Sequence, residues 1–314
     1  MAYFHLFAGQ IEIGLGEFYD AIFNFDPVNP KTNHLLAREF RIPRMTMAVV
    51  AGAALSIAGL LMQTLFNNPL AGPYVLGINS GASLFVAFSF MTGIPLLTSD
   101  LGTVSSALIG AFLFGVLIMS FSYKVKSHIS LLLIGLMLGS FTSAVVYILQ
   151  AVSSAEELKA FTMWAMGSLQ HAQLSELPFI LLLFVAGIVG SLFIIKPLNV
   201  LVIGERDAKL LGTNIRVVRL IIISLTALLT GLITAYCGPI AFVGLAIPNL
   251  VKIVFKTQKH GTLLLASALT GGIFLLLCDL IIQLLEQHIH IPINAFTSLI
   301  GAPFVVFIVL KRLA

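Results

Sequence analysis

Few residues of this sequence could do chemistry, and the first candidate is an acid inside an apolar stretch. Asp279 lies within Leu263–Leu285, which is otherwise mostly hydrophobic. A carboxylate inside a membrane-spanning helix is costly to bury and is therefore a candidate proton relay. The alternative is a hydrogen bond that packs one helix against another. We expect no Lys or Arg within the membrane to pair with Asp279, which weakens the relay interpretation.

A second group of candidate ligands follows the same stretch. Glu286 is followed by His288 and His290 at alternate positions. A metal site would require these side chains to converge, and such alternation is common in loops, so we predict no metal site. Cys237 and Cys278 are isolated thiols that give neither metal-ligand spacing nor a disulfide framework.

Enzyme signatures are absent from the sequence. It has no Gly-rich phosphate loop ending in Gly-Lys-Ser/Thr, so we do not expect this chain itself to bind ATP or to need a cofactor. It also has no His-Glu-x-x-His pattern. A membrane enzyme would need a set of reacting groups that the sequence does not offer.

A polar segment, residues 198–216, carries the most informative pattern. Gly204 precedes a run from Glu205 to Leu211 that can form two helical turns, and Gly212 follows where a helix would stop. On such a helix Ala208 and Leu211 should share one face. A short helix of this kind could dock on a soluble partner. It could equally be a solvated connector, and composition alone leaves both readings open.

The elements that position these residues are predicted by composition. Of 314 residues, 59% are hydrophobic and only 10% are charged, with a mean hydropathy of +1.06. Soluble proteins carry roughly 25% charged residues, so we expect an all-α protein embedded in a membrane. Nine stretches are long and apolar enough to be candidate spans. They are Met45–Phe66, Val75–Leu97, Leu101–Tyr123, Ile129–Ser153, Leu177–Pro197, Val217–Tyr236, Pro239–Phe255, Leu263–Leu285 and Pro292–Leu310. Prolines and a glycine interrupt the seventh, which could be a half-helix.

Basic residues predict the orientation, because cytoplasmic loops are enriched in Lys and Arg. Twelve of the seventeen Lys and Arg residues lie in or beside the connections that follow the third, fifth and seventh spans, or at the C-terminus. We therefore place these connections and the C-terminus in the cytoplasm. The twelve residues are Lys124, Lys126, Lys196, Arg206, Lys209, Arg216, Arg219, Lys252, Lys256, Lys259, Lys311 and Arg312. Nine spans then place residues 1–44 outside, as an interfacial segment before a transmembrane domain of residues 45–314. This segment holds Lys31, Arg38, Arg41 and Arg44. Either an upstream span is missing, or these external basic residues have a task.

Several motifs occur in one order along the chain. They are Arg41-Ile-Pro-Arg44, Gln63-Thr-Leu-Phe-Asn-Asn-Pro-Leu-Ala71, Leu76-Gly-Ile-Asn-Ser-Gly-Ala82, Trp164-Ala-Met-Gly-Ser-Leu169, Gly204–Gly212, Gly238-Pro-Ile-Ala-Phe-Val-Gly-Leu-Ala-Ile-Pro248 and Gly301-Ala-Pro-Phe304. Together they resemble the FecCD family of permease subunits from bacterial ABC importers. The family imports ferric siderophores, haem, cobalamin and related metal chelates. Its members have a type II permease bundle of ten spans, so this chain resembles one that lacks the first.

The resemblance implies a complex in the bacterial cytoplasmic (inner) membrane. A second permease copy, two cytoplasmic ATPase subunits that hold ATP and magnesium, and an external substrate-binding protein would complete it. The chelate would cross by alternating access. A ferric siderophore is the default cargo, with haem, cobalamin or a molybdate-type oxyanion as alternatives. A proton-coupled secondary transporter using Asp279 is the rival function.

The resemblance also assigns roles by position. The ATPase-coupling residues would be Gly204, Glu205, Arg206, Ala208, Leu211 and Gly212. Arg41 and Arg44 would dock the binding protein, and Gln283 stands where one relative has a further docking arginine. The stretch Ser127, His128, Ile129 and Ser130 matches the region of the cytoplasmic gate.

Overall fold

The computed structural model describes residues 14–26, 31–92, 99–125, 127–286 and 289–313, and these residues contain helices but no strand. The longest described helical run extends from Thr32 to Leu65, through α3, η1 and α4. The elements are α2 (Leu15–Phe23), α3 (Thr32–Leu35), the π-helical η1 (Leu36–Arg41), α4 (Ile42–Leu65), η2 (Pro73–Leu76), α5 (Ile78–Met91), α7 (Asp100–Lys124), α8 (His128–Val152), α9 (Ala155–Ala165), η3 (Leu174–Glu176), α10 (Leu177–Phe193), α11 (Ile195–Leu201), α12 (Glu205–Leu210), α13 (Ile215–Cys237), α14 (Val243–Phe255), α15 (His260–Leu285) and α16 (Ile293–Leu313).

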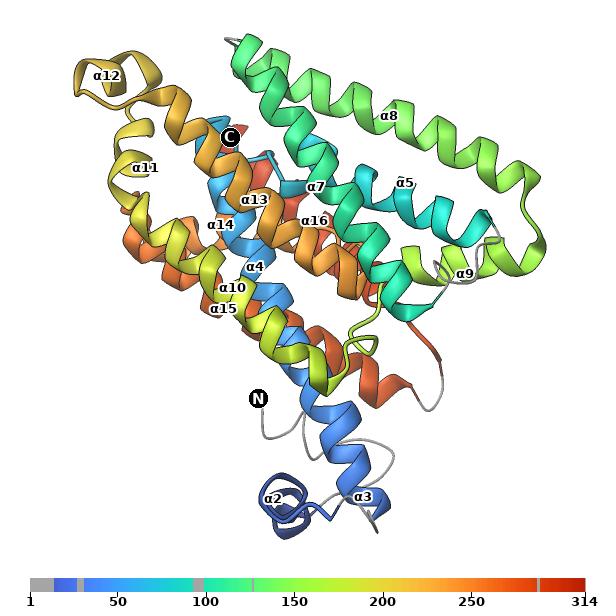
Figure 1. Cartoon of the computed structure of the whole chain (residues 1–314). Helices are drawn as coiled ribbons and strands as arrows, with labels where there is room; N and C mark the ends of the chain where they lie inside the picture. Colours follow the sequence, from blue (N-terminus) through green and yellow to red (C-terminus); the bar gives the residue numbers. More distant parts are fainter. Residues whose placement is uncertain (1–13, 27–30, 93–98, 126, 287–288, 314) are drawn as a thin grey trace.

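Helix α4 forms the centre of the bundle (Figure 1). Every residue from 50 to 66 is buried, and α13, α14 and α15 pack around this helix. Small residues allow the close approach. A methyl group on Gly52 would collide with Gly271 of α15, and one on Gly59 would collide with Gly244 of α14. Such contacts are typical of helices that pack inside membranes.

A second layer is built from α5, α7 and α8 (Figure 1). Helix α5 packs against both α7 and α8, and α7 also packs against α13, which joins this layer to the centre. Gly81 of α5 faces Gly110 of α7, so these two helices also approach closely. Helix α8 lies at the edge of the bundle, and many of its side chains are exposed.

The predicted spans correspond to helices of two kinds. Six helical runs are long and apolar enough to cross a membrane, and α5, α14 and α16 are shorter apolar helices. The seventh predicted span is a half-helix, since α14 begins only at Val243, after Phe242 adopts a left-handed backbone. Helix α9 was not predicted, because its residues Ala155–Ala165 include three charged side chains and were assigned to a gap.

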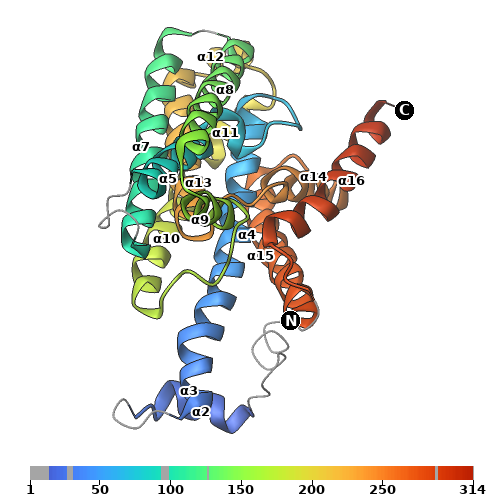
Figure 2. The same ribbon diagram turned by 90° about the vertical axis from the view of Figure 1, so that its right-hand side faces the viewer.

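The N-terminal segment does not end where the sequence suggested. Helical residues run without a break from Thr32 to Leu65, across the predicted boundary at residue 44. Helix α2 packs against α3 and η1, away from the rest of the bundle (Figure 2). At the opposite end, α16 diverges from its neighbours toward the C-terminus (Figure 2).

Candidate functional site

Helix α12 is the short helix expected between Gly204 and Gly212. Gly204 has φ +123° and Gly212 has φ +80°, backbone conformations that other residues rarely adopt. The N–H of Gly212 donates to the Lys209 carbonyl and the N–H of Thr213 donates to the Ala208 carbonyl, both at 3.0 Å. This is the hydrogen-bond pattern of a glycine-terminated helix. The two glycines therefore define both ends of α12, as the sequence indicated.

The faces of α12 differ from those expected. Ala208 is fully buried, whereas Leu210 and Leu211 are 80% and 65% exposed. The expectation that Ala208 and Leu211 share one face is wrong, because the helix ends at Leu210 and Leu211 already belongs to its C-terminal turn. Its outward surface consists of Arg206, Asp207, Lys209, Leu210 and Leu211. This surface joins an exposed apolar pair to charges of both signs, and we call it the α12 surface.

An arginine joins α12 to the next helix and to a distant loop. Arg219 lies in the second turn of α13 and is only 6% exposed. Its Nη2 donates to Glu205 Oε1 at 3.1 Å, and its Nη1 donates to the Val125 carbonyl at 3.0 Å. Val125 directly follows α7. One buried guanidinium thus joins the first residue of α12 to the residue that follows α7.

The sequence reasoning counted Arg219 only as a basic residue near a loop. Its position, two residues inside the predicted span Val217–Tyr236, was the signal that could have identified it. An ionisable side chain within a predicted span marks a candidate functional residue.

The segment before α12 is anchored separately. Asn199 Oδ1 of α11 accepts the backbone N–H of His260 at 2.8 Å and lies 3.0 Å from its Nδ1. The other ring nitrogen, Nε2, lies 2.8 Å from Thr64 Oγ1 of α4. The buried His260 therefore connects α11, α4 and the first residue of α15. The coupling segment is held to the bundle on both sides of α12.

The predicted gate residues lie at the start of α8, close to the Arg219 contacts. Ser127 caps this helix, with its Oγ 3.4 Å from the N–H of Ser130. Ser127 and Ile129 are exposed, and the side chain of His128 lies outside the described residues. Val125, whose carbonyl accepts from Arg219, lies two positions before Ser127, so the Arg219 contacts are near the predicted gate residues in the sequence.

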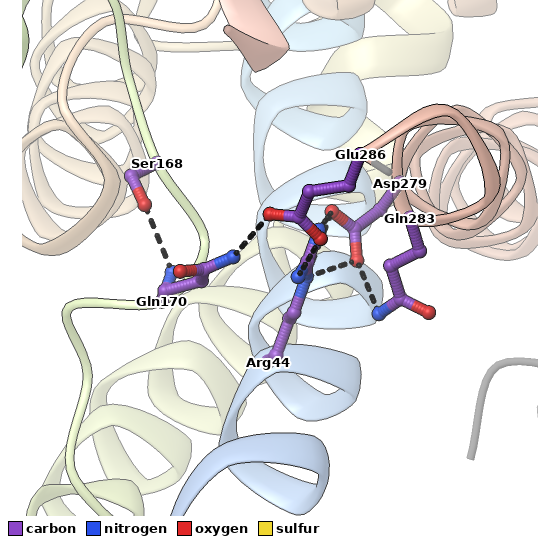
Figure 3. A network of polar contacts seen from close by, with 6 residues as sticks. All are labelled: Arg44, Ser168, Gln170, Asp279, Gln283 and Glu286. Carbon is purple, nitrogen blue, oxygen red and sulfur yellow. Dashed lines mark hydrogen bonds and ion pairs between the residues drawn. The ribbon is translucent and has the colours of Figure 1, made fainter. Parts of the chain in front are cut away.

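A second buried arginine lies toward the α2 end of the molecule. Arg44 of α4 is 12% exposed at its side chain and faces Asp279 of α15 (Figure 3). Its Nε donates to Asp279 Oδ2 at 2.9 Å, and its Nη2 donates to Oδ1 at 2.9 Å. The expectation that no basic residue pairs with Asp279 is therefore wrong. The helix of Arg44 begins upstream of the predicted span and packs along α15, which brings the two residues together.

Other polar groups extend this pair (Figure 3). Arg44 Nη1 lies 3.4 Å from Glu286 Oε2, and Gln170 Nε2 donates to Glu286 Oε1 at 3.4 Å. Gln283 Nε2 donates to Asp279 Oδ2 at 3.4 Å. Arg44, Asp279 and Glu286 line a cleft of about 320 Å³. Asp279 thus bonds one helix to another, which is the second of the two interpretations that the sequence left open.

The metal candidates do not converge where the structure can be followed. Among the described residues, no three His, Cys, Asp or Glu side chains gather as metal ligands. Glu286 is engaged by Arg44 and Gln170, and His290 lines the same cleft. His288 lies outside the described residues. Cys237 and Cys278 are both free and buried.

The predicted docking residues differ in exposure. Arg41 and Arg44 are both partly exposed, and Gln283 is buried. Arg44 and Gln283 are bonded to Asp279. Docking by these residues stays a prediction.

A groove rich in hydroxyl groups opens between η2, α5 and α8. It has a volume of about 500 Å³ and includes Tyr74, Ser80, Ser140, Ser143 and Tyr147. Among its described lining residues, none carries a charge. Ser140, Ser143 and Tyr147 are exposed on one face of α8. Such hydroxyl groups can donate and accept hydrogen bonds to a polar solute.

Comparisons with known proteins agree with this architecture. The family model described as the FecCD transport family matches residues 1–311. The hemin transport system permease protein of Yersinia pestis is 34% identical over 275 residues, covering 87% of this chain and 82% of that protein. The iron(3+)-hydroxamate import system permease protein FhuB of Bacillus subtilis is 30% identical over 313 residues, covering 96% of this chain and 78% of that protein. A solved structure of a metal-chelate type ABC transporter in an inward-facing conformation matches with a TM-score of 0.86 and 30% identity, covering 99% of this chain and 95% of that one.

The family match covers nearly the whole chain, and the fold match has the same extent. Six long apolar helices agree with a protein that crosses the membrane several times. The relatives are permease subunits and not enzymes. The chain therefore belongs to the FecCD transport family, as a multi-pass permease subunit of an ABC importer.

Proposed function

We propose that this chain is the transmembrane subunit of an ATP-driven importer and that the α12 surface is its contact with an ATPase subunit. The observation that carries this proposal is the exposed pair Leu210 and Leu211 on a short helix fixed by glycines at both ends. An exposed apolar pair surrounded by charges is suited to a groove on a soluble partner. The twelve basic residues counted above support a cytoplasmic location for α12 and for the C-terminus.

The complete importer would contain two permease copies, two ATPase subunits and an external substrate-binding protein. The binding protein delivers the cargo, and ATP binding and hydrolysis move α12 and switch the side on which the permease is open. The exposed hydroxyl face of α8 supports a polar path next to a second copy, since hydroxyl groups can hydrogen-bond a polar solute and lipid tails cannot. The partly exposed Arg41 supports docking of the substrate-binding protein at the end of the molecule opposite α12.

The cargo we propose is a metal chelate, with a ferric siderophore first. The relatives named for hemin and for iron(3+)-hydroxamate support this class. Haem, cobalamin and a molybdate-type oxyanion are the alternatives. The hydroxyl-lined groove supports a cargo recognised by hydrogen bonds more than by charge. Mass spectrometry of the ligand that co-purifies with the binding protein identifies the cargo.

Substitutions on α12 test the ATPase contact. Leu210→Glu and Leu211→Glu should greatly reduce co-purification of the ATPase and ATP-dependent uptake into proteoliposomes, because they place charge in an apolar contact. Leu210→Met and Leu211→Met are matched controls that keep the apolar surface and should preserve both readouts. Undiminished association of the Glu variants would contradict the assignment of the α12 surface.

The rival function, proton-coupled transport through Asp279, is not favoured. The chain belongs to an ABC importer family, and Asp279 is held by two nitrogen atoms of Arg44. Both oxygen atoms of Asp279 thus accept from Arg44, which gives this carboxylate a role in joining α4 to α15. Uptake that needs internal ATP and survives collapse of the proton gradient supports the importer. Uptake without ATP that stops when the gradient collapses would support the rival.

A further inference from the structure

The contacts of Arg219 connect two regions that the family resemblance treats separately. The coupling residues lie in 204–212 and the gate residues in 127–130, more than seventy positions apart in the sequence. Arg219 lies in neither set. Its guanidinium nevertheless contacts Glu205, the first residue of α12, and the carbonyl of Val125, two residues before Ser127.

The surroundings of Arg219 make this contact specific. The side chain is 7% exposed, while the Glu205 carboxylate is 31% exposed and reachable by water. A cleft of about 460 Å³ separates the end of α7 from α12 and the start of α13. Arg219 bridges this cleft from the α13 side. Its partners therefore belong to two other segments, α12 and the residue after α7, while the arginine itself stands on a long packed helix.

We propose that Arg219 is a positioning residue that transmits displacement of α12 to the gate region at the start of α8. This inference rests on the proposed function, because α12 moves only if the ATPase acts on it. When α12 shifts, Glu205 shifts with it and displaces the Arg219 guanidinium through Nη2. The Nη1 of the same guanidinium then displaces the Val125 carbonyl. Ser127 and the start of α8 then change position with α12.

The geometry requires an arginine. A guanidinium offers several N–H groups in a fixed planar arrangement, so it can bind a carboxylate and a carbonyl at once. A lysine has one ammonium group on a flexible chain and would hold one partner well or both poorly. Arg219→Lys should therefore retain part of the linkage, and Arg219→Met should remove it.

A spin label at the gate tests the linkage. Ser127 is exposed, so Ser127→Cys can carry a nitroxide, with the buried Cys237 and Cys278 checked as background in the unsubstituted chain. Spectra are recorded for the permease alone and for the complex with its ATPase, with and without a non-hydrolysable ATP analogue. Co-purification of the ATPase is measured for every variant. Arg216→Met is the matched control, because Arg216 is exposed on the preceding turn of α13 and lines the same cleft.

In the unsubstituted complex we expect the nucleotide to change the mobility of the label. Arg219→Met should lose most of this change while still binding the ATPase, and it should increase label mobility in the permease alone. Arg219→Lys should show an intermediate response, and Arg216→Met the full response. If Arg219→Met does not fold, Glu205→Gln provides the test, since it removes the charge that binds Arg219 and should also weaken the response.

Two results would overturn the inference in different ways. A full nucleotide response and unchanged mobility in Arg219→Met would show that Arg219 does not link α12 to the gate, with the proposed function intact. Failure of the unsubstituted chain to bind any ATPase would refute the proposed function, and the transmission step with it. A general loosening of the fold would instead raise label mobility equally at a distant exposed site such as Ser175→Cys, in η3 at the far end of α10 from α12.

Discussion

Two buried arginines, Arg44 and Arg219, hold the two ends of this permease in different ways. Arg44 joins α4 to α15, two long helices that pack along each other, and its main partner Asp279 is as buried as the arginine. Arg219 stands on one long helix, but its partners belong to a six-residue helix and to the connection after α7. We therefore infer that Arg44 stabilises the packing of two long helices, whereas Arg219 connects two short segments.

The two arginines differ in how firmly the helices of their partners, Asp279 and Glu205, are held in the bundle. Asp279 cannot move without α15, whose close contact with α4 at Gly52 and Gly271 fixes both helices. Glu205 begins a helix with much exposed surface, and segments with few buried contacts are the ones that shift at low free-energy cost. We expect loss of Arg44 to affect stability first, and loss of Arg219 to affect communication first.

The largest effect should follow Arg44→Met. Breaking a buried ion pair from one side destabilises a protein by about 3–5 kcal/mol, because the remaining charge is left without its partner. Arg44→Met should lower the free energy of unfolding by that order, measured by thermal denaturation in detergent. The double variant Arg44→Met/Asp279→Asn should recover a large part of the loss. Glu286→Gln, at the longer and more exposed contact, should change stability by less than about 1 kcal/mol.

An Arg44→Met variant as stable as the parent would contradict the claim that Arg44 stabilises the packing of α4 on α15. Equal losses in the single and double variants would do the same, because the loss would then not come from an unpaired Asp279. With Asp279→Asn as the second single variant, these proteins form a double-mutant cycle that measures the coupling free energy between Arg44 and Asp279.

Arg219→Met should cost less stability than Arg44→Met. Glu205 can be solvated after the substitution, so the loss should be about 1–3 kcal/mol, the range for a buried group left without its hydrogen bond. Arg216→Met, on the exposed side of the same helix, should change the free energy of unfolding by no more than about 0.5 kcal/mol. Chemical denaturation of the three proteins checks this. If Arg219→Met proves more damaging than Arg44→Met, the contrast between the two ends is reversed.

The glycines that bracket α12 should have a smaller effect. Gly212→Ala places a side chain at φ +80°, which costs about 1–2 kcal/mol of local strain. The change should fray α12 and reduce ATPase binding without unfolding the bundle. Gly261→Ala in the first turn of α15 is the matched control, and helix propensity predicts a gain of up to about 1 kcal/mol. Proteolysis of the 198–216 segment, compared with global unfolding, separates local from general loss.

The smallest effect is expected at Arg41. Its side chain is partly exposed, so Arg41→Glu should weaken binding-protein affinity by roughly fivefold, about 1 kcal/mol, and more at low salt. Titration of the purified binding protein at two ionic strengths measures this effect. Affinity that neither falls nor depends on salt would remove Arg41 from the docking surface.

The sequence predicted those features that depend on neighbouring residues. Gly204 and Gly212 indicated the limits of α12, and the interrupted segment after Pro239 indicated a half-helix, because both signals are local. Span lengths were less accurate, since α5 and α14 are shorter than their apolar stretches. Helix α9 escaped prediction because its charged residues resemble a connection, although Ser154 and Glu157 form a capping box at its start that is readable in the sequence.

The two arginine contacts could not be predicted, for different reasons. Arg44 and Asp279 are 235 positions apart, and no pattern in one sequence pairs them. Glu205 and Arg219 are only 14 positions apart, but the third partner is the Val125 carbonyl, which has no sequence signal. The burial of Ala208 beside the exposed Leu211 was also missed, because two turns of helix are too short for periodicity to fix a face.

The number of ATP molecules hydrolysed per substrate imported, measured in proteoliposomes, tests the central claim most directly. If Arg219 transmits the movement of α12 to the gate, Arg219→Met should still bind the ATPase and hydrolyse ATP but import far less substrate. The ratio should then rise severalfold, with Arg219→Lys between the variant and the parent. An unchanged ratio, with hydrolysis and import falling together, would contradict the account.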